Sequence, residues 1–422
     1  MNVNDIKPEV YELARQAEEE IRPQFERIDR IAMLNTRKVM TAFQDNKVSD
    51  SCFAGTTGYG YDDLGREVLD KVYAQVFCTE AALVRIGFVN GTHALSAALF
   101  GILKPGDTLL SVTGLPYDTL RNAIGIEGDC HGSLKFYGIN YKQVDLKDGE
   151  ADLKDGEADL EAIKAALADR SISAVLIQRS RGYENRKALS AEEIGEICSA
   201  VKSVAPNVTV MVDNCYGEFT GEHEPTEYGV DIMAGSLIKN PGGGLAPTGG
   251  YIVGRKDLVE NAAMRLTTPG IGGECGASLG NNRLLFQGFL MAPHIVAQAI
   301  KTVTFCSAMM KKIGFESSPA PDEARNDIIQ MVTLKNGENM KKFCRGVQAG
   351  APVDSYVTPE PWQMPGYNVP VIMAAGAFVQ GSSIELSADG PMREPYTLYV
   401  QGGITYESGK LGIMMAVNEM LS

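Results

Sequence analysis

Four polar side chains in the middle of the chain could do chemistry together. Val208 to Val212 is an apolar run typical of a strand that is buried on both faces of a sheet, and Asp213 follows it at once. Tyr216 comes next, and Ser236 and Lys239 follow a second apolar piece. In open α/β sheets, the groups that contact ligands lie just past the carboxyl ends of the strands. We therefore predict that a carboxylate, a phenol, a hydroxyl and an amine converge at one sheet edge.

This set of groups suits pyridoxal phosphate as a cofactor. Lys239 is flanked by apolar residues and by a glycine-rich turn, and partial desolvation there should lower its pKa and free its amine to bind the cofactor aldehyde covalently. Asp213 would keep the pyridine nitrogen protonated, and Tyr216 would hydrogen-bond the ring oxygen.

Each residue also has a simpler interpretation. An aspartate at a strand end is commonly a helix N-cap or a turn former, and a lysine before glycines is commonly a solvated surface residue. The order is more specific than its members. Asp213-x-x-Tyr216 followed by Ser236-x-x-Lys239 resembles the arrangement in fold-type I pyridoxal-phosphate enzymes.

The start of a predicted helix could bind the cofactor phosphate. Gly91, Thr92 and His93 open a helix that runs to Leu103 and follows a predicted strand at 82–86. Free N–H groups, a hydroxyl and the positive end of the helix dipole all suit a phosphate dianion. A Gly-Thr pair alone is commonly only a cap. Its place before the first long helix is similar to the phosphate loop of fold-type I enzymes, so we assign Gly91, Thr92 and His93 to cofactor binding.

Tyr117 follows the predicted strand Thr108 to Val112. In the fold-type I superfamily an aromatic ring at this position stacks on the pyridine face, and the alternative is a tyrosine that only packs in the core. The resemblance implies stacking, and it makes Tyr117 a candidate proton donor.

Three motifs point to one family. They are GYGYDDLGRE at 58–67, IQRSRGY at 177–183 and QGGITY at 401–406. The first motif alone would be a loop with packing tyrosines, in which Asp62 or Asp63 caps the next helix. Together, the motifs resemble the aluminium resistance or methionine gamma-lyase-like family, a branch of the pyridoxal-phosphate enzymes of cysteine and methionine metabolism. The resemblance spans nearly the whole chain.

The resemblance implies that subunits share their sites. In the wider superfamily a tyrosine and an arginine from the first loop reach the cofactor phosphate of the neighbouring subunit. Tyr59 or Tyr61 and Arg66 are the matching residues, and the position of Tyr59 favours it. We therefore expect a homodimer or a homotetramer.

Two further regions bear on cofactor and substrate. Superfamily members usually have Pro and Asn where this chain has Gln178 to Arg181, and that Asn contacts the cofactor ring oxygen. Gln178, Arg179 or Arg181 could take its place and contact the cofactor or substrate, or Tyr216 could contact the ring oxygen alone. An arginine near the C-terminus commonly binds the substrate carboxylate, because the guanidinium fork matches carboxylate geometry. Arg393 is the candidate here, with a surface salt bridge as the alternative. We expect Arg181 and Arg393 to bind substrate.

Composition excludes several classes of function. The 422 residues carry a formal charge of −14, which argues against nucleic acid or an anionic membrane surface as a partner. No uninterrupted apolar run approaches the ~20 residues that cross a bilayer. The eight cysteines and four histidines have no zinc-site spacing, so we expect no metal, and free cysteines without an export signal indicate the cytoplasm. An acidic tandem repeat, LKDGEAD twice within 146–159, is interpreted as a surface insertion.

The predicted fold is α/β and of fold type I, with a mostly parallel sheet flanked by helices and a smaller C-terminal α/β domain. We predict an N-terminal helical arm at 1–50, a large cofactor-binding domain at 51–290 and a small domain at 291–422. Pro23 should divide the arm into two helices, and the arm should pack against a partner subunit.

The predicted reaction is cleavage of a carbon–sulfur bond in a sulfur amino acid, of the cystathionine beta-lyase or methionine gamma-lyase type. Two alternatives stay open. The core residues do not separate elimination from transamination or aldol cleavage. A non-catalytic stress protein that binds the cofactor or a metal is the second alternative, suggested by the aluminium resistance label of the family.

Overall fold

The computed structural model describes residues 2–128, 130–147, 156–363 and 369–422. They form two compact units. The central unit is Thr36–Leu290, and the terminal unit joins Met1–Asn35 to Met291–Ser422. The first 35 residues of the predicted arm therefore belong to the same unit as the C-terminal residues. Most of the acidic repeat, 148–155, lies outside the described residues.

The central unit is built on a mostly parallel sheet. Among the described residues its order is β1-β7-β6-β5-β4-β2-β3. Strands β2 to β6 run parallel, and β7 pairs antiparallel with both β6 and β1. The strands are β1 (Ala81–Arg85), β2 (Thr108–Ser111), β3 (Asn140–Gln143), β4 (Ile172–Gln178), β5 (Thr209–Asp213), β6 (Ile232–Ser236) and β7 (Gly250–Gly254).

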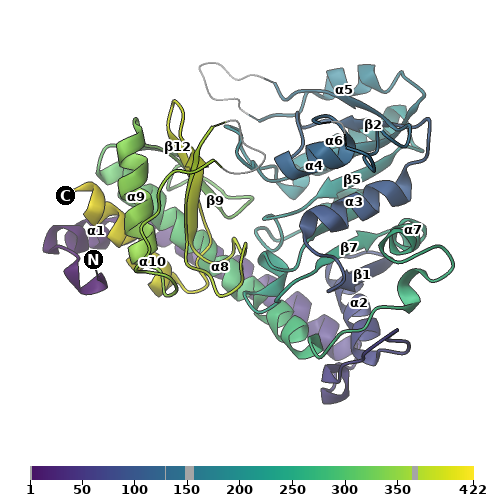
Figure 1. Cartoon of the computed structure of the whole chain (residues 1–422), viewed down its shortest axis with the longest axis horizontal. Coiled ribbons are helices and arrows are strands. Elements are labelled where there is room, and N and C mark those ends of the chain that lie inside the picture. The colour runs from purple at the N-terminus through teal and green to yellow at the C-terminus, as the bar shows by residue number, and fades with distance from the viewer. Residues whose placement is uncertain (1, 129, 148–155, 364–368) are drawn as a thin grey trace. The chain divides into compact units, whose positions relative to one another are not determined.

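Helices flank this sheet on both faces (Figure 1). They are α2 (Leu64–Val76), α3 (Gly91–Ile102), α4 (Asp118–Ile124), α5 (Leu160–Ala166), α6 (Ala191–Val204) and α7 (Lys256–Leu266). Because both faces are covered, β6 is buried throughout and β5 is buried from Val210 to Asp213, as the apolar run before Asp213 predicted. Local capping fixes where helices start: Asp63 accepts a hydrogen bond from the Arg66 amide at the start of α2, and Ser190 forms a capping box with Glu193 at α6.

The terminal unit has an antiparallel sheet in the order β10-β11-β12-β9-β8 over the described residues. Helices α9 and α10 pack against each other, and their buried residues share one apolar core with those of the sheet. The elements are β8 (Glu316–Ser318), β9 (Ile329–Thr333), α9 (Gly337–Ala349), β10 (Val371–Ala375), β11 (Ser387–Pro391), β12 (Thr397–Gln401) and α10 (Tyr406–Met420).

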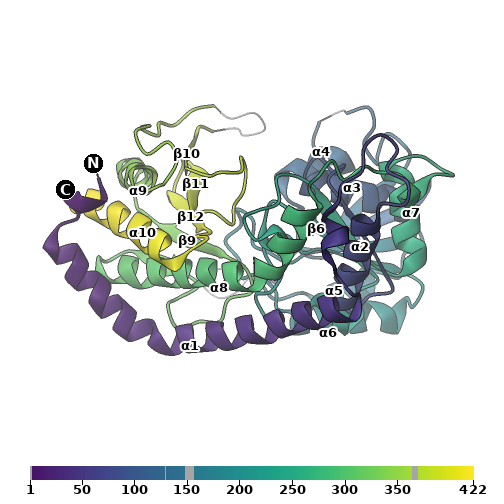
Figure 2. The same ribbon diagram turned by 90° about the horizontal axis from the view of Figure 1, so that it is seen from below.

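The predicted break at Pro23 is wrong. One helix, α1 (Pro8–Asp45), runs through it without interruption (Figure 2). A proline inside a helix removes one backbone hydrogen bond, but apolar residues continue on one side of the helix before and after it. Val10 and Ile21 are buried in the core of the terminal unit, and Val39 is buried further along. Packing of this long stripe outweighs the local penalty. It also covers the buried side of the first part of the helix within its own chain, and packing of the arm against a partner subunit stays a prediction.

The long helix α8 (Asn282–Lys312) corrects one inference from composition. The chain has no uninterrupted apolar run of membrane-spanning length, yet an 18-residue window of α8 has a mean hydropathy of 1.3, enough by length and composition to cross a bilayer. Of that window, 72% is buried inside the protein. Burial against protein is what a core helix of a soluble domain also shows, and Pro293 lies within it.

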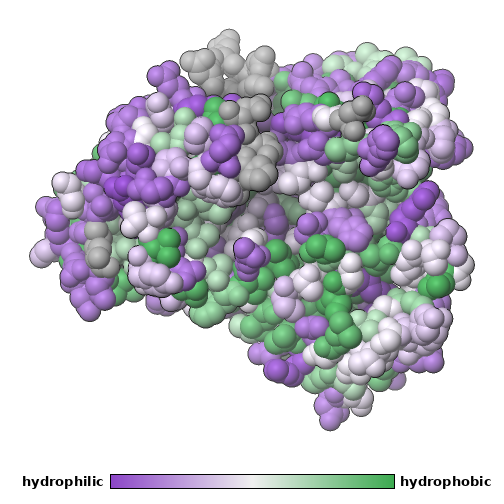
Figure 3. All heavy atoms as spheres, viewed as in Figure 1, coloured by the Kyte–Doolittle hydropathy of each residue, from purple (hydrophilic) through white to green (hydrophobic). Residues whose placement is uncertain are grey.

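Apolar side chains also reach the surface of the central unit. Figure 3 shows hydrophobic residues gathered over α2 and the first turns of α8. Exposed apolar side chains of α2, of α8 and of the segments just before them include Leu64, Leu290, Phe53 and Leu279. Patches of this kind commonly mark surfaces that another molecule covers.

Candidate functional site

The ends of three neighbouring strands bring the predicted chemical groups together. Gln178, Asp213 and Ser236 are the last residues of β4, β5 and β6. The register pairs Gln178 with Asp213 and Asp213 with Ala234, so all three strands end at one edge of the sheet. Lys239 follows three residues after Ser236. The candidate site lies at this edge, as parallel strands require.

Asp213 is buried, and its carboxylate is held by the backbone. The Cys215 amide donates a hydrogen bond to Asp213 Oδ1 at 3.1 Å. Burial raises the pKa of Asp213, whereas hydrogen bonds from Cys215 and the charges of Lys239 and Arg186 oppose the rise. A carboxylate in such a poorly screened place interacts strongly with any cation that reaches it.

Lys239 lies against Tyr216, with its Nζ 3.6 Å from the centroid of the phenol ring. The prediction that the lysine pKa is lowered is wrong for the cofactor-free protein. Desolvation lowers it, but the acidic groups of Tyr216, Cys215 and Asp213 favour the ammonium form, and the net direction is upward. Sequence reasoning weighed only desolvation, because the acidic neighbours become visible only in three dimensions.

The turn after Asp213 has an unusual backbone. Tyr216 and Phe219 adopt the left-handed conformation, with φ angles of 73° and 63°, which costs about 1–3 kcal/mol for a residue other than glycine. The Glu224 carboxylate accepts a hydrogen bond from the Phe219 amide at 2.8 Å. This contact holds the Phe219 end of the turn that carries Tyr216.

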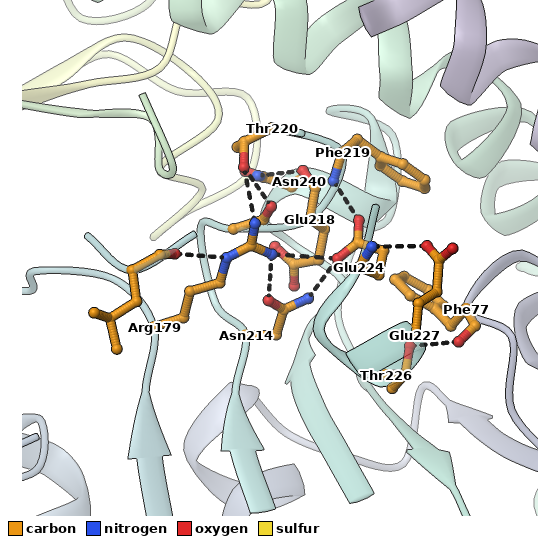
Figure 4. Close-up of polar contacts among 12 residues, drawn as sticks. Phe77, Arg179, Asn214, Glu218, Phe219, Thr220, Glu224, Thr226, Glu227 and Asn240 are labelled. Carbon is orange, nitrogen blue, oxygen red and sulfur yellow. Dashed lines mark hydrogen bonds and ion pairs between the residues drawn. The ribbon is translucent and has the colours of Figure 1, made fainter. Parts of the chain in front are cut away.

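A buried arginine supports the same turn from beneath (Figure 4). The Arg179 guanidinium donates to Asn214 Oδ1 at 2.8 Å and to Thr220 Oγ1 at 3.3 Å, and it pairs with Glu224 Oε2 at 3.2 Å. A Cβ on Gly217 would lie 2.4 Å from Arg179 Cδ, so only glycine fits there. Arg179, one of three candidates for contacting the cofactor or substrate, is thus engaged by protein groups, and nothing in its sequence position had signalled this role.

The start of α3 lies against the end of β6. A Cβ on Gly91 would be 3.0 Å from Ser236 Cβ and 3.4 Å from Cys215 Sγ. Asn90 caps the helix by accepting from the His93 amide at 2.9 Å. Ser236 Oγ is buried, and it has no hydrogen-bond partner among the residues that the structure describes. An orphaned hydroxyl beside the free N–H groups of a helix start is a site suited to a phosphate.

The other two residues of the predicted phosphate loop have local partners. Thr92 Oγ1 is hydrogen-bonded to Thr119 Oγ1 at 2.7 Å, and His93 Nδ1 accepts from the Val89 amide at 3.2 Å. The hydroxyl of Thr92 can still accept from or donate to a ligand, because a hydroxyl has more than one hydrogen-bonding position.

Tyr117 precedes α4 as its N-cap residue and is half-buried. Its ring centroid is 6.1 Å from that of Tyr183, and a Cβ on Gly182 would lie 3.3 Å from its ring edge. The loop after β4 therefore packs against the Tyr117 ring. Arg181 in this loop is fully buried, and Gln178 donates to the Ser180 carbonyl at 3.1 Å. Stacking by Tyr117 and substrate binding by Arg181 stay predictions.

The Tyr59 loop divides into an exposed and a buried part. Tyr59 and Tyr61 are 72% and 55% exposed, with stacked rings 5.6 Å apart. Arg66, by contrast, is buried, and it donates to the carbonyls of Gly60, at 2.5 Å, and Gly276, at 2.9 Å. In this structure Arg66 holds its own loop together, so Tyr59 is the better candidate to reach a neighbouring subunit.

Arg393 is exposed in the turn between β11 and β12 of the terminal unit, and its role with substrate stays a prediction. Across the described ranges, no group of three or more His, Cys, Asp or Glu side chains is placed to hold a metal ion. Sequence reasoning did not find Cys215, Arg186 or Glu218, which surround the predicted groups; none of them stands in a recognisable motif.

A family model described as methionine gamma-lyase matches residues 10–421. The chain belongs to this family. A carbon-sulfur lyase involved in aluminium resistance from Clostridium novyi is 52% identical, with 98% of this chain and 96% of that chain covered and a TM-score of 0.93. A candidate cystathionine beta-lyase involved in aluminium resistance from Clostridium acetobutylicum is 48% identical, with 99% and 97% covered and a TM-score of 0.95.

A more distant likeness bears on the fold alone. The pyridoxal-5'-phosphate dependent protein YhfS from Escherichia coli is 18% identical, with 91% of this chain and 94% of that chain covered and a TM-score of 0.60. The family and the fold class predicted from the sequence are thus confirmed.

The orphaned hydroxyl of Ser236 gives a test of the phosphate site. Inorganic phosphate should raise the melting temperature of the cofactor-free protein, and Ser236→Ala should weaken its binding about 10-fold, because a charge-assisted hydrogen bond is lost. Without phosphate the variant should melt at the wild-type temperature or slightly above it, since an unpartnered buried hydroxyl is removed. Ser203→Ala, on the exposed end of α6, is the control. Equal protection of Ser236→Ala and wild type by phosphate would contradict the assignment.

Proposed function

We propose that this chain is a pyridoxal-phosphate-dependent carbon–sulfur lyase that acts on a sulfur amino acid. One observation carries the proposal: the unpartnered Ser236 hydroxyl beside Gly91 at the start of α3. It offers a phosphate site at the same sheet edge as Asp213 and Lys239. Family membership supports the class of reaction. Pyridoxal phosphate needs a lysine, a carboxylate and a phosphate-binding site close together, and the presence of all three at one edge of the sheet supports it as the cofactor.

The residues fit that cofactor in chemistry and placement. Ser236, Gly91 and Thr92 would hold its phosphate, and Asp213 would hold the proton on its ring nitrogen. Bound in this way, the cofactor supplies an electron-withdrawing ring that stabilises negative charge at a substrate Cα. Lys239 would bind the cofactor covalently.

The chain's own groups then move the protons. The Lys239 amine would remove the proton from the substrate Cα, and its ammonium form would then give a proton back to the Tyr117 oxygen, so that both groups return to their starting state. Tyr216 lies beside Lys239 Nζ and keeps the amine oriented. The Tyr117 hydroxyl would protonate the departing sulfur as the C–S bond breaks, so that a thiol leaves. The unsaturated amine that remains becomes an imine, and one water hydrolyses it to ammonia and a 2-oxo acid. Each of these steps uses a group near the edge formed by β4, β5 and β6.

Two other functions are the alternatives. Transamination or aldol cleavage would use the same lysine and aspartate, and product analysis separates them from elimination. A non-catalytic stress protein is suggested by the aluminium resistance named for the Clostridium relatives. A measured turnover of a sulfur amino acid dismisses it.

The central test concerns Lys239. Purified protein given cystathionine, methionine or cysteine should release a 2-oxo acid from at least one of them, together with a thiol or sulfide, and Lys239→Ala should abolish the release because no other group replaces the amine. Borohydride reduction followed by peptide mapping should place the cofactor mark on Lys239. Lys256, an exposed lysine at the start of α7, is the internal control. A mark on Lys256 instead would refute the site.

Asp213→Asn should separate chemistry from cofactor retention. The amide keeps size and hydrogen bonding but removes the charge that holds the proton on the ring nitrogen. We expect a rate lower by roughly 10²- to 10⁴-fold, with the protein folded and still yellow. Steady-state rates and the absorption spectrum of the same sample measure both properties. Thiol release at close to the wild-type rate with cofactor bound would show that Asp213 is not the pyridine partner.

We also propose that the protein is a homodimer, or a dimer of dimers, in which each active site has residues of two subunits. We propose the cytoplasm as its location. The exposed Tyr59 and Tyr61 rings and the apolar surface over α2 (Figure 3) support a covering subunit. All eight cysteines are free, which suits a reducing compartment.

Subunit mixing tests this assembly. An inactive Lys239→Ala chain mixed with an inactive Tyr59→Phe chain should regain part of the activity, because one hybrid site then has both intact residues. Each variant alone, at the same total concentration, is the control. A wild-type protein that stays monomeric by light scattering while fully active would rule out shared sites.

A further inference from the structure

Glu218 is a buried carboxyl group close to the site that the proposed reaction does not use. It lies in the turn after Asp213, two residues beyond Tyr216, and has no exposed surface. The Tyr251 hydroxyl donates to its Oε1 at 2.7 Å. Its Oε2 is buried and has no hydrogen-bond partner among the residues that the structure describes. An ionised carboxylate with one unsatisfied oxygen would be very unfavourable there.

Among the residues that the structure describes, no cation forms an ion pair with Glu218. The buried cation of this cluster is Arg179, which is paired with Glu224 at 3.2 Å (Figure 4). Lys38 also favours the charged form of Glu224, but its own ion-pair partner is Glu227, at 3.4 Å. The titratable groups that face Glu218 come from α2, the residue after β4, the turn after β5, the following loop and β7. They are Tyr73, Arg179, Cys215, Glu224 and Tyr251. One arginine cannot neutralise two buried carboxylates, so one of the two glutamates must be protonated.

The neighbours decide which glutamate carries the charge. Glu224 accepts from the Phe219 amide at 2.8 Å and from Asn214 at 3.3 Å in addition to its ion pair, and such donors favour a carboxylate. Burial raises the pKa of Glu218 to about 8, with the Tyr251 hydrogen bond opposing. Burial raises the pKa of Glu224 too, but Arg179 opposes it most strongly.

Glu218 also joins three parts of the site. Its backbone carbonyl accepts from Asn240 Nδ2 at 3.0 Å, and Asn240 directly follows Lys239. Its carboxyl lies against the bare backbone of β6, where a Cβ on Gly235 would be 2.7 Å from Oε1. Gly235 directly precedes Ser236. The residue therefore connects the Tyr216 turn with the segments that carry the proposed phosphate ligand and the lysine.

We propose that Glu218 is a neutral carboxylic acid in the working protein and a positioning residue that fixes the Tyr216 turn against the segments of Ser236 and Lys239. A neutral acid keeps a second negative charge out of the cluster and still accepts from Tyr251. The positioning role rests on the proposed function, whereas the protonation state does not.

The protonation state can be tested without cofactor or substrate. A carboxyl whose pKa is raised in the folded state stabilises the protein below its unfolded pKa, and that contribution is lost as pH rises towards about 8. Glu218→Gln is isosteric and cannot titrate. We therefore expect the difference in melting temperature, cofactor-free Glu218→Gln minus cofactor-free wild type, to increase from pH 5 to pH 8 and to stay constant above pH 8.

The same substitution at Glu224 is the matched control. Glu224→Gln leaves the Arg179 charge unpaired and should melt below wild type throughout this pH range. Two outcomes overturn the protonation state: a Glu218→Gln difference that is flat or falls with pH, or a reversed pattern in which position 224 tolerates glutamine and position 218 does not.

Cofactor affinity tests the positioning role. Pyridoxal phosphate titrated at pH 6.5 should bind Glu218→Gln as it binds wild type. Tyr251→Phe, which keeps the ring but loses the hydroxyl that orients the carboxyl, should bind about 10-fold more weakly, and Glu218→Ala should bind at least as weakly. If both bind like wild type, Glu218 has no positioning role. If no variant and no wild-type protein binds the cofactor, the proposed function fails instead, while the melting experiment still decides the protonation state.

Discussion

The ion pair between Arg179 and Glu224 is the interaction on which the candidate site depends. Both side chains are almost fully buried, so taking them out of water costs several kcal/mol. Hydrogen bonds to Asn214, Thr220 and the Phe219 amide offset that cost, because they satisfy the remaining donors and acceptors. The pair in turn holds the left-handed turn after β5 in shape.

The interactions that bring the reactive residues of this site to one place differ from those that orient their side chains. Parallel strands deliver Asp213 and Ser236 to one edge of the sheet through backbone hydrogen bonds and apolar burial alone. Orientation needs specific contacts: the Cys215 amide for the Asp213 carboxylate, and Tyr216 for Lys239. Such contacts can place a reactive group within a fraction of an ångström, which strand pairing alone does not do.

The sequence predicted what depends on local pattern. The buried strand before Asp213 and the helix start at Gly91 follow from apolar runs and turn residues, and both were found. Long-range contacts decided the rest. The uninterrupted helix through Pro23 depends on a core built from distant residues, and the upward pKa of Lys239 depends on acidic groups from another turn. Arg66 and Arg179 are arginines whose partners no spacing rule could name.

The glycine beside Arg179 has an evolutionary consequence. Arg179 Cδ, Nε and Nη1 lie within 2.8 Å of the place that a Cβ on Gly217 would take, so the missing side chain is what lets the guanidinium reach Glu224. A larger residue at 217 alone would displace the Arg179 side chain. Loss of Arg179 alone would leave the buried Glu224 carboxylate without its ion-pair partner. Positions 179, 217 and 224 can therefore change only together, so among diverging relatives all three should be kept or all three replaced.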